Sequence, residues 1–392
     1  MTDHTKTHEV VVIGGGYAGT LAANRLQQNP AIGITLVNPR PKFVQRLRLH
    51  QFAAGTGDAT ADYGSLLGER VRLVVDSVTR IDTAARKVLL ASGDTLGYDY
   101  VIYAVGSTAA APAGVPGVAE FAYPLAEFEP AQRLRTALDA SDPDVPITVV
   151  GGGLTGIEIA AELTEQGRNV TMVCGGRLAP SFAEPARRSV AKWLNGNRVT
   201  VLEGAVVTEV RTDAVVLADG TVRPSAITIW TGGFGVPDLA TQSGLRTDAL
   251  GRLLTDETLT SVDDDRIVGG GDAVAPSGHA VRMCCAAAGP TAATAVDTVL
   301  SRIAGVPPAT FDMAFIASNV GLGRRAAVGQ FTHKDDTPVD FHIRGRIPAM
   351  LKEAVTKGAL WGLRREARKP GSTVWLKGGP RPALEREVST TP

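Results

Sequence analysis

The chain has 392 residues, of which 44% are hydrophobic, 20% charged and 5% aromatic, and this composition excludes a disordered, collagen-like or coiled-coil protein. Its 40 Lys and Arg residues balance 40 Asp and Glu residues, so no overall field favours nucleic acid as a partner. The length predicts two or three domains rather than a single small binding module.

The first unit begins after a polar N-terminus. Residues 9–13 form a short β-branched run, which predicts a buried parallel strand. A glycine-rich turn at 14–19, an amphipathic helical stretch at 20–28 and a second apolar run at 32–37 follow. In such a turn the first glycine makes the bend, the second admits a pyrophosphate, and the third packs helix on strand. The order predicts a dinucleotide-binding unit whose cofactor contacts are Gly14, Gly16 and Gly19.

Asn38 ends the second predicted strand. This position is usually an acidic residue, because a carboxylate accepts a hydrogen bond from a ribose hydroxyl. The amide carbonyl of Asn38 can accept the same bond, so we expect Asn38 to contact the adenosine ribose of a cofactor.

The same order returns after a Pro- and Asp-rich boundary at 140–146. An apolar run at 147–150 leads into a second glycine turn, a helical stretch at 157–166 and another apolar run at 169–173. A lone glycine turn is weak evidence, but two copies in the same context predict two cofactor sites. The second set of predicted contacts is Gly151, Gly153 and Gly156.

The second copy also lacks a carboxylate at the ribose position. Cys174 stands there and is followed by Gly-Gly-Arg177. Without a carboxylate there is no repulsion toward a 2′-phosphate, and Arg177 could pair with one through two hydrogen bonds. We therefore expect NADPH to be used, with NADH as an alternative. The alternative for Arg177 is a solvated surface residue.

Glycine-rich and basic segments follow the second unit. Residues 267–272 form a further strand that ends in glycines and Asp272, and 281–304 is Ala-rich and predicted to be helical. From 342 to the end there are eleven Lys or Arg residues against four Glu. Within this tail, 347–368 places apolar and basic residues at near-helical spacing. Such a helix could lie on an anionic membrane surface, or could dock onto its own domains or a second subunit.

Two tandem dinucleotide units with these further strand ends resemble the two-dinucleotide-binding-domain flavoproteins of the pyridine nucleotide-disulfide oxidoreductase superfamily. The stretches 98–107 and 226–232 look like the family's two crossing motifs, with Gly106 and Gly232 near their ends, and 267–273 resembles its second FAD fingerprint. The resemblance assigns Asp272 to the ribityl and pyrophosphate region, with Ala273 beside it.

The segment 43–55 indicates which branch of this flavoprotein superfamily the chain resembles. Disulfide reductases carry a redox-active Cys pair shortly after the first glycine turn, whereas here no Cys precedes Cys174. The segment resembles that of type II NADH:quinone dehydrogenases and the related ferroptosis-suppressor and apoptosis-inducing-factor-like oxidoreductases. This implies that Arg46 and His50 approach the flavin or the acceptor, unless both are structural.

Glu158 matches the Glu that these families place beside nicotinamide and flavin, with helix stabilisation as the alternative. For His50 a further role is proton donation to a reduced acceptor, because an ordinary His pKa lies near neutrality.

The acceptor side departs from the family pattern. Where quinone-reducing members show a Gln-containing, Ala-rich motif, this chain reads Arg-Met-Cys-Cys-Ala-Ala-Ala-Gly at 282–289. We expect Met283 and Cys284 at a helix start near the flavin, where backbone N–H groups could stabilise negative charge. Cys284 and Cys285 could form a redox relay, although buried inert cysteines are commoner.

Together these observations predict an α/β fold with two Rossmann-like dinucleotide-binding domains, the NAD(P) domain inserted into the FAD domain, plus a C-terminal segment. We assign 1–118 and 245–305 to the FAD domain, 119–244 to the NAD(P)H domain, and 306–392 to a C-terminal interface or membrane-surface segment. The longest charge-free run, 100–119, is broken by prolines and glycines and does not predict a membrane span.

The expected activity is that of an FAD-dependent NAD(P)H oxidoreductase that passes electrons to a quinone-like acceptor. Its catalytic residues would be Glu158 and His50, and no metal is expected. Alternatives are a reductase for a ferredoxin-type carrier and an apoptosis-inducing-factor-like redox-sensing interaction protein. Three Cys and no signal-like segment predict a cytoplasmic protein, with the inner face of the membrane and a homodimer as open alternatives.

Overall fold

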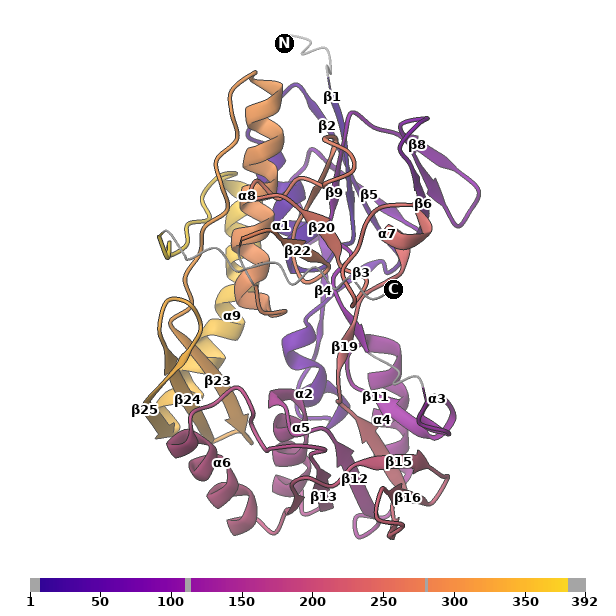
Figure 1. Cartoon of the computed structure of the whole chain (residues 1–392), viewed down its shortest axis with the longest axis vertical. Coiled ribbons are helices and arrows are strands. Elements are labelled where there is room, and N and C mark those ends of the chain that lie inside the picture. Colours follow the sequence, from indigo (N-terminus) through magenta and orange to yellow (C-terminus); the bar gives the residue numbers. More distant parts are fainter. Residues whose placement is uncertain (1–7, 110–113, 279–280, 380–392) are drawn as a thin grey trace, which may run out of the picture.

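The computed structural model describes residues 8–109, 114–278 and 281–379. It contains two parallel sheets of five strands each, which lie toward opposite ends of the long axis (Figure 1). The first sheet has the order β21-β9-β1-β2-β5, with the bounds β1 His8–Ile13, β2 Ile32–Asn38, β5 Val71–Val75, β9 Tyr100–Tyr103 and β21 Ile267–Gly269. Because β21 pairs with β9 although the whole second sheet lies between them in sequence, the second unit is inserted into the first, as predicted.

The second sheet repeats the architecture. Its order is β11-β18-β12-β13-β14, with the bounds β11 Ala122–Pro124, β12 Pro146–Val150, β13 Asn169–Val173, β14 Thr200–Leu202 and β18 Ile227–Trp230. Its helices are α4 Phe128–Ala140, α5 Leu154–Glu165 and α6 Glu184–Gly196. The mixed α/β fold with two Rossmann-like units is therefore confirmed. The residue boundaries that we assigned to the domains stay a prediction.

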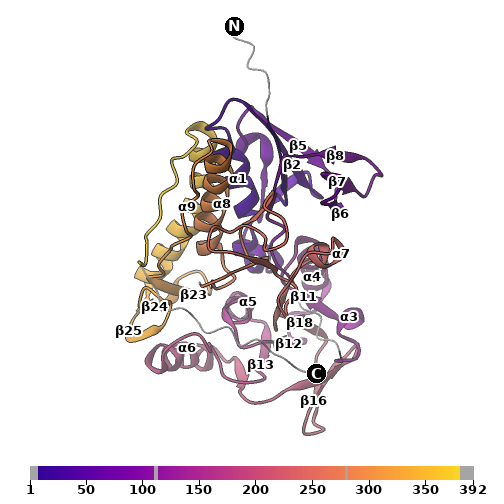
Figure 2. The ribbon, with the colours of Figure 1, turned by 45° about the horizontal axis from the view of Figure 1, so that its top comes forward.

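Two helices cover one face of the first sheet. They are α1 Tyr17–Leu26, which opens directly from the first glycine turn, and α8 Cys285–Ile303. Both are rich in fully buried alanine, and small side chains let two helices pack closely on each other and on the sheet. Figure 2 shows α1 and α8 side by side, with the C-terminal helix next to them.

The start of α8 differs from the prediction. The Ala-rich composition predicted helix from 281, but the helix begins at Cys285 because Cys284 is extended, with φ −162° and ψ 158°. Residues 281–284 form the loop that precedes it.

Short antiparallel elements complete the two units. The meander β6-β7-β8 packs on the first unit and β15-β16-β17 on the second. The remaining bounds are β3 Lys42–Val44, η1 Arg46–Arg48, α2 Leu49–Ala53, β4 Thr60–Asp62, η2 Tyr63–Ser65, β6 Val78–Asp82, β7 Lys87–Leu90, β8 Thr95–Gly97, β10 Thr108–Ala109, α3 Val118–Phe121, β15 Val207–Val210, β16 Ala214–Leu217, β17 Val222–Pro224, β19 Phe234–Gly235, α7 Leu239–Gln242, β20 Leu253–Thr255 and β22 Val274–Pro276.

The C-terminal segment forms a three-stranded antiparallel sheet and one long helix. The bounds are β23 Ala317–Leu322, β24 Ala326–Thr332, β25 Pro338–Gly345 and α9 Arg346–Arg368. The predicted helix at 347–368 is thus confirmed, and it continues through Gly358 and Gly362 because one face packs on the body of the protein. The end of the basic tail, 380–392, lies outside the described residues.

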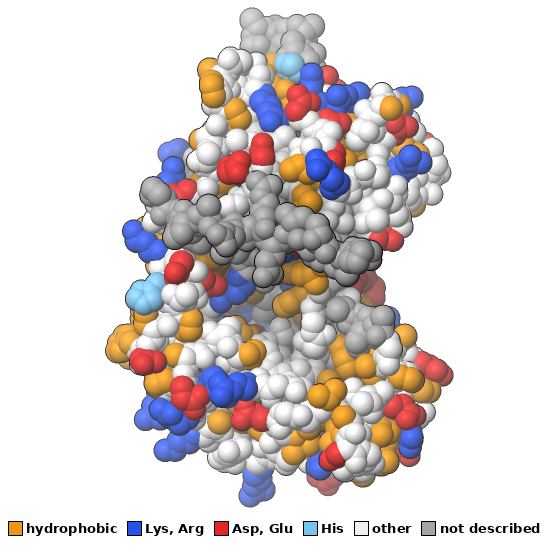
Figure 3. All heavy atoms as spheres, in the orientation of Figure 1, with side chains coloured by type: hydrophobic (Ala, Val, Ile, Leu, Met, Phe, Trp, Pro, Cys, Tyr) orange, Lys and Arg blue, Asp and Glu red, His pale blue; other side chains and the backbone are white. Residues whose placement is uncertain are grey.

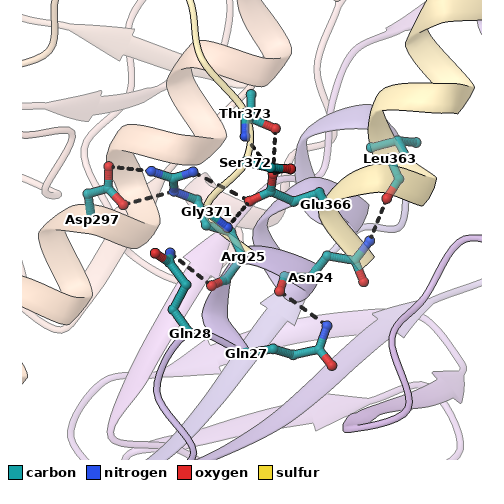
Figure 4. Close-up of polar contacts among 10 residues, drawn as sticks. All are labelled: Asn24, Arg25, Gln27, Gln28, Asp297, Leu363, Glu366, Gly371, Ser372 and Thr373. Atoms are coloured by element: carbon teal, nitrogen blue, oxygen red, sulfur yellow. Dashed lines mark hydrogen bonds and ion pairs between the residues drawn. The ribbon is translucent and has the colours of Figure 1, made fainter. Parts of the chain in front are cut away.

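A partly buried ionic cluster attaches the end of α9 to the first unit (Figure 4). The Arg25 guanidinium on α1 donates two hydrogen bonds to Asp297 on α8, at 2.8 and 2.9 Å, and lies 3.4 Å from Glu366 on α9. Glu366 is fully buried and also accepts hydrogen bonds from residues 371–373, which turn back along the helix. A buried carboxylate is stable only when it is paired and hydrogen-bonded in this way.

Charges of both signs are mixed over the face shown in Figure 3, in keeping with the zero net charge. Among the described helices, none combines the length and apolar character that a membrane crossing requires.

Candidate functional site

The first glycine turn, between β1 and α1, has the shape that a phosphate-binding turn needs. Gly14 has φ +100°, and a Cβ there would lie 2.4 Å from the Ala104 carbonyl oxygen. A Cβ on Gly19 would lie 1.7 Å from the carbonyl oxygen of Gly14, so the third glycine sets the distance between helix and turn. Gly16, in contrast, faces open space. The two outer glycines are fixed by protein packing and the middle one is free for a ligand.

The second turn, between β12 and α5, repeats this arrangement. Gly151 has φ +126°, and its Cβ would lie 2.5 Å from the Thr231 hydroxyl oxygen. A Cβ on Gly156 would lie 2.2 Å from the Gly151 carbonyl oxygen, while Gly153 again faces open space. Gly232, at the end of β18, follows Thr231 and accepts a hydrogen bond through its carbonyl from the Trp230 indole. Both turns therefore have an open middle position at a helix start.

Asn38 supports the first turn. Its Oδ1 accepts a hydrogen bond from the Gly15 N–H at 2.9 Å, and its Nδ2 donates to the Arg40 carbonyl at 2.7 Å. The Tyr63 hydroxyl donates to the Gly15 carbonyl at 2.7 Å. Tyr63 was not found from the sequence, because it lies 48 residues from the turn in a 3-10 helix without a motif. Contact of Asn38 with a ribose stays a prediction, although its oxygen keeps a second lone pair for one.

Arg46 connects the first crossing segment with the second fingerprint. Its guanidinium donates to the Ser107 carbonyl at 2.7 Å and to the Ser107 hydroxyl at 2.9 Å, and that hydroxyl donates to Asp272 Oδ2 at 2.7 Å. Burial lowers the pKa of Arg46, and Asp272 opposes the shift. Gly106, with φ +71°, lies beside the Arg46 guanidinium. The structure thus brings together three predicted residues from three parts of the chain.

For two other predicted cofactor contacts, Ala273 and Arg177, the structure gives less direct support. The Ala273 side chain is fully buried in the apolar core behind the sheet, and its carbonyl accepts a hydrogen bond from Leu253. Any contact of Ala273 with a cofactor would therefore run through its backbone N–H. Arg177 is exposed in the loop after β13, and this loop folds over the second glycine turn, where Ala179 donates to the Gly152 carbonyl.

Met283 and Cys284 lie half-buried in the loop before α8, as the resemblance implied for the helix start. Burial raises the pKa of Cys284, and it raises that of Cys285 to about 12. The reactive form of cysteine is the thiolate, and a raised pKa makes this form scarcer at neutral pH. This favours inert cysteines over a redox relay.

Glu158 is the centre of a buried polar cluster. It lies on α5, two residues after the second glycine turn, with 11% of its side chain exposed. Oε1 accepts hydrogen bonds from the Gly321 N–H on β23, at 3.0 Å, and from the Lys352 ammonium on α9. His50 Nδ1 on α2 lies 3.6 Å from Oε2. Burial acts to raise the pKa of Glu158, but Lys352, His50 and the Gly321 N–H outweigh it and hold the pKa below its usual value.

His50 lies in a different environment from the one that its ordinary pKa assumes. Its side chain is buried, and burial lowers its pKa to about 4 against the opposing pull of Glu158. This shift favours a neutral imidazole at pH 7, so it does not support proton donation by His50, which stays a prediction.

A cavity of about 280 Å³ opens beside Glu158. Helices α2, α5 and α9 and the β23–β24 hairpin enclose it, and most of its lining is polar. The lining residues are Leu47, His50, Gln51, Glu158, Glu162, Gly321, Gly323, Arg324, Ala326, Ala349, Lys352, Glu353, Thr356 and Lys357. Lys352 was not found from the sequence, because only the fold brings α9 to α5 across 194 residues.

Tyr17, on the first turn of α1, carries a further polar group that a ligand could contact. Its hydroxyl is buried and has no hydrogen-bond partner among the described residues. Burial raises its pKa, with Cys285, Arg48 and Arg46 within electrostatic reach. A buried hydroxyl without a protein partner beside an open glycine position fits a site whose ligand supplies the partner. Within the described ranges, no group of three or more His, Cys, Asp or Glu side chains could hold a metal ion.

Comparison with known proteins agrees with this geometry. The family described as pyridine nucleotide-disulphide oxidoreductase matches residues 8–296. The chain belongs to this oxidoreductase family. Membership accounts for the two dinucleotide cradles, and FAD and NADH are the cofactors that it implies. The residues present fit both, since each glycine turn leaves its middle position open.

Relatives of this oxidoreductase extend the match to the C-terminal segment. The NADH dehydrogenase-like protein YutJ of Bacillus subtilis is 27% identical over 366 residues, covering 90% of this chain and 98% of its own. A type II NADH:quinone oxidoreductase of Haemophilus influenzae is 25% identical over 388 residues, covering 83% and 87%.

Two solved structures share the fold. The sulfide:quinone oxidoreductase of Aquifex aeolicus superposes with a TM-score of 0.78 at 19% identity, covering 92% of both chains. The NDH2 of Plasmodium falciparum in complex with NADH gives 0.77 at 15% identity, covering 92% of this chain and 97% of that one.

Proposed function

We propose that this oxidoreductase is an FAD-dependent NAD(P)H dehydrogenase that delivers electrons to a quinone-like acceptor. The observation that carries the proposal is the Glu158–Lys352 pair, which closes a polar cavity at the junction of the second glycine unit, α2 and the C-terminal helix. The type II NADH:quinone oxidoreductase and NADH dehydrogenase-like relatives match most of this chain and support the same reading.

The glycine turns and the buried polar contacts would hold the cofactors. Gly14, Gly16 and Gly19 would seat the FAD pyrophosphate, with Asp272 and Arg46 near the ribityl region. When bound, FAD supplies the redox chemistry, accepting a hydride from the reduced nicotinamide and passing its electrons on. The second turn would place the nicotinamide nucleotide beside Glu158, so that the protein contributes orientation.

The Glu158–Lys352 pair would hold a proton for the acceptor. A reduced quinone gains two protons, and the Lys352 ammonium is hydrogen-bonded to Glu158 at the cavity wall. The Lys352 ammonium would donate one proton to the reduced acceptor and regain it from water, and water would supply the second proton. The ionised Glu158 carboxylate would hold the ammonium in place. His50 would stay neutral and fill the site beside the carboxylate.

For the nucleotide, we propose that Arg177 admits NADPH as well as NADH. It is exposed on the loop that covers the second glycine turn, and β13 ends without a carboxylate. An exposed guanidinium at that strand end can reach a 2′-phosphate.

The outward face of α9 supports contact with a membrane surface, where a lipid quinone would be found. The inward face of α9 packs on the rest of the chain through Pro348, Thr356 and Leu363, so for that face the helix docks onto its own protein. Its outward face exposes Ile347 (69%), Met350 (72%), Leu351 (52%), Val355 (67%) and Trp361 (61%). Such a stripe beside basic residues is typical of helices that lie in the interface of an anionic membrane.

An anaerobic titration tests the proposal. The purified protein, loaded with FAD, is titrated with NADH and then NADPH while its visible absorbance is recorded, and a short-chain quinone is added last. Bleaching followed by rapid recovery with quinone is expected. Recovery only with a ferredoxin would favour a carrier reductase, and a persistent long-wavelength band with slow recovery would favour a redox sensor. Failure to bind FAD would refute the assignment.

A further inference from the structure

A second cavity, away from Glu158, lies between the segment 64–70 and the C-terminal end of α9. Its volume is about 940 Å³, and it opens widely to solvent. The lining residues are Gln27, Gly64, Ser65, Leu67, Gly68, Glu69, Arg70, Arg364, Ala367, Arg368 and Pro370. We call this cavity the arginine groove. Neither the cofactor cradles nor the Glu158 cluster share its residues.

The two walls of the arginine groove are tied together from behind. The Asn24 amide donates to the Leu66 carbonyl at 2.7 Å and to the Leu363 carbonyl on α9 at 3.3 Å, and its oxygen accepts from the Gly68 N–H at 2.9 Å. Glu366, one turn further along α9, is fixed by Arg25 (Figure 4). The groove is therefore held in shape before any ligand arrives, which lowers the entropic cost of binding.

The groove carries a local excess of positive charge. Its described lining includes three arginines and one acidic residue, Glu69. The Arg70 guanidinium is held by four backbone carbonyls, those of residues 27, 29, 30 and 32. Arg364 and Arg368 stand one helical turn apart on α9, and within the described ranges no ion pair involves either of them. Like charges at this spacing repel, so a bound anion would stabilise them.

The groove adjoins one edge of the exposed apolar face of α9. At about 100° per residue, Arg368 lies in line with Met350, and Arg364 lies about 40° from it. Met350 and Trp361 form this edge of the apolar face, whereas Ile347, Leu351 and Val355 lie further round the helix. Arg365 stacks on the Trp361 ring, with 5.4 Å between the guanidinium carbon and the ring centroid. Apolar residues that enter a membrane beside arginines at headgroup depth form one continuous surface.

We propose that the arginine groove binds the phosphate of an anionic phospholipid headgroup. Arg364 and Arg368 would contact the phosphate oxygens, and the apolar part of the lining, Leu67, Ala367 and Pro370, would contact the glycerol backbone. The inference rests on the membrane attachment proposed above and adds the lipid class that the attachment prefers. It does not depend on the nature of the electron acceptor.

Flotation of the full-length, FAD-loaded protein with vesicles tests the proposal. One vesicle preparation is phosphatidylcholine alone, and the other contains phosphatidylglycerol in addition. The test variant is Arg364→Gln with Arg368→Gln. The matched control is Arg344→Gln with Arg346→Gln, which removes the same charge from exposed positions at the end of β25 and the start of α9. Flavin absorbance and thermal midpoint check that each variant is folded.

We expect phosphatidylglycerol to raise the partition of the wild-type protein. Diffuse attraction of one basic residue to an anionic surface contributes a factor of about five, so the loss of two such charges alone lowers the partition by about 25-fold. Direct contacts to phosphate add to this attraction, so the test variant should lose more than about 25-fold of the gain. The control should lose clearly less, because bidentate contacts to phosphate are confined to the groove.

Two results would overturn the proposal without touching the proposed dehydrogenase activity. One is an equal loss in the test and control variants, which would mean diffuse attraction alone. The other is equal wild-type binding to both vesicles. If inorganic phosphate nevertheless raised the thermal midpoint of the wild-type protein and not that of the test variant, the arginine groove would bind a free anion and not a lipid. Absence of wild-type binding to either vesicle would overturn the membrane attachment as well, while the quinone assay would still decide the activity.

Discussion

Replacement of Lys352 by Met tests the centre of the candidate site. Burial alone raises the pKa of Glu158, and Lys352 is the strongest of the groups that oppose this shift. Without the ammonium, the pKa of Glu158 should rise above its usual value. The carboxyl group would then be protonated over a higher pH range, and the acid limb of quinone reduction should move upward.

The magnitude follows from the burial of the pair. The Glu158 side chain is 11% exposed and that of Lys352 is 20% exposed. Removal of one partner of a buried pair costs about 3–5 kcal/mol, and the partial exposure of Lys352 places the loss near the lower end. A positioned acid or base contributes about 10²–10⁴-fold to a rate, so kcat with quinone should fall by about 10²-fold or more.

The sign of the pH dependence can be worked out. The pKa of Glu158 is lowered in the folded wild type, so the stability that it contributes is present above the unfolded pKa of about 4.3 and is lost as pH falls through the folded value. The difference in unfolding free energy between wild type and the Lys352→Met variant should therefore be greatest near neutral pH and shrink in acid.

Steady-state kinetics against pH with a soluble quinone, together with urea unfolding at matched pH, measure both effects. Lys192→Met, on the exposed surface of α6, is the control for loss of a lysine. An unchanged acid limb in the Lys352 variant, or an equal loss of kcat in the control, would refute the role of the pair.

Four further predictions follow from the geometry. Gly16→Val should fold, because Gly16 faces open space, but it should fail to retain flavin, because the new side chain would occupy the space proposed for the pyrophosphate. Gly19→Ala should lose stability, because its Cβ would overlap a carbonyl oxygen. Flavin content and thermal midpoint separate the two effects. Arg25→Met should cost about 3–5 kcal/mol in urea unfolding, since it leaves the buried carboxylate of α9 without its cation, and a loss below 1 kcal/mol would contradict this. His50→Gln should leave the pH profile of kcat unchanged between about pH 5.5 and 8, because the wild-type imidazole would be neutral over this range. The variant should also resist acid unfolding better. A histidine whose pKa falls to about 4 on folding weakens the fold as pH drops from about 6.5 toward 4, and the variant lacks this histidine. Arg177→Ala should lower the NADPH to NADH ratio of kcat/KM, and an unchanged ratio would exclude contact with the 2′-phosphate.

The sequence by itself was sufficient for the two dinucleotide units. Strand, glycine turn and helix follow one another within about thirty residues, and each step depends on local physics: β-branched runs extend, and the turn needs glycine where φ is positive or a Cβ would overlap. The positions of Gly14, Gly19, Gly151 and Gly156 in the structure have these reasons. The insertion of one unit into the other could also be predicted, because a third strand-and-glycine segment returned near residue 270.

The tertiary structure decided what the side chains between these motifs do. Lys352 reaches Glu158 across 194 residues, Tyr63 supports a turn 48 residues away, and the fold buries His50 and lowers its pKa. Hydrogen bonds and desolvation depend on which groups lie within a few ångströms and on how much water remains, and neither quantity has a period or spacing along the chain. For this protein the cofactor cradles are therefore encoded locally, and the charge and protonation of the candidate site exist only once α9 has packed on α1 and on the β23–β24 hairpin, which brings Lys352 to Glu158.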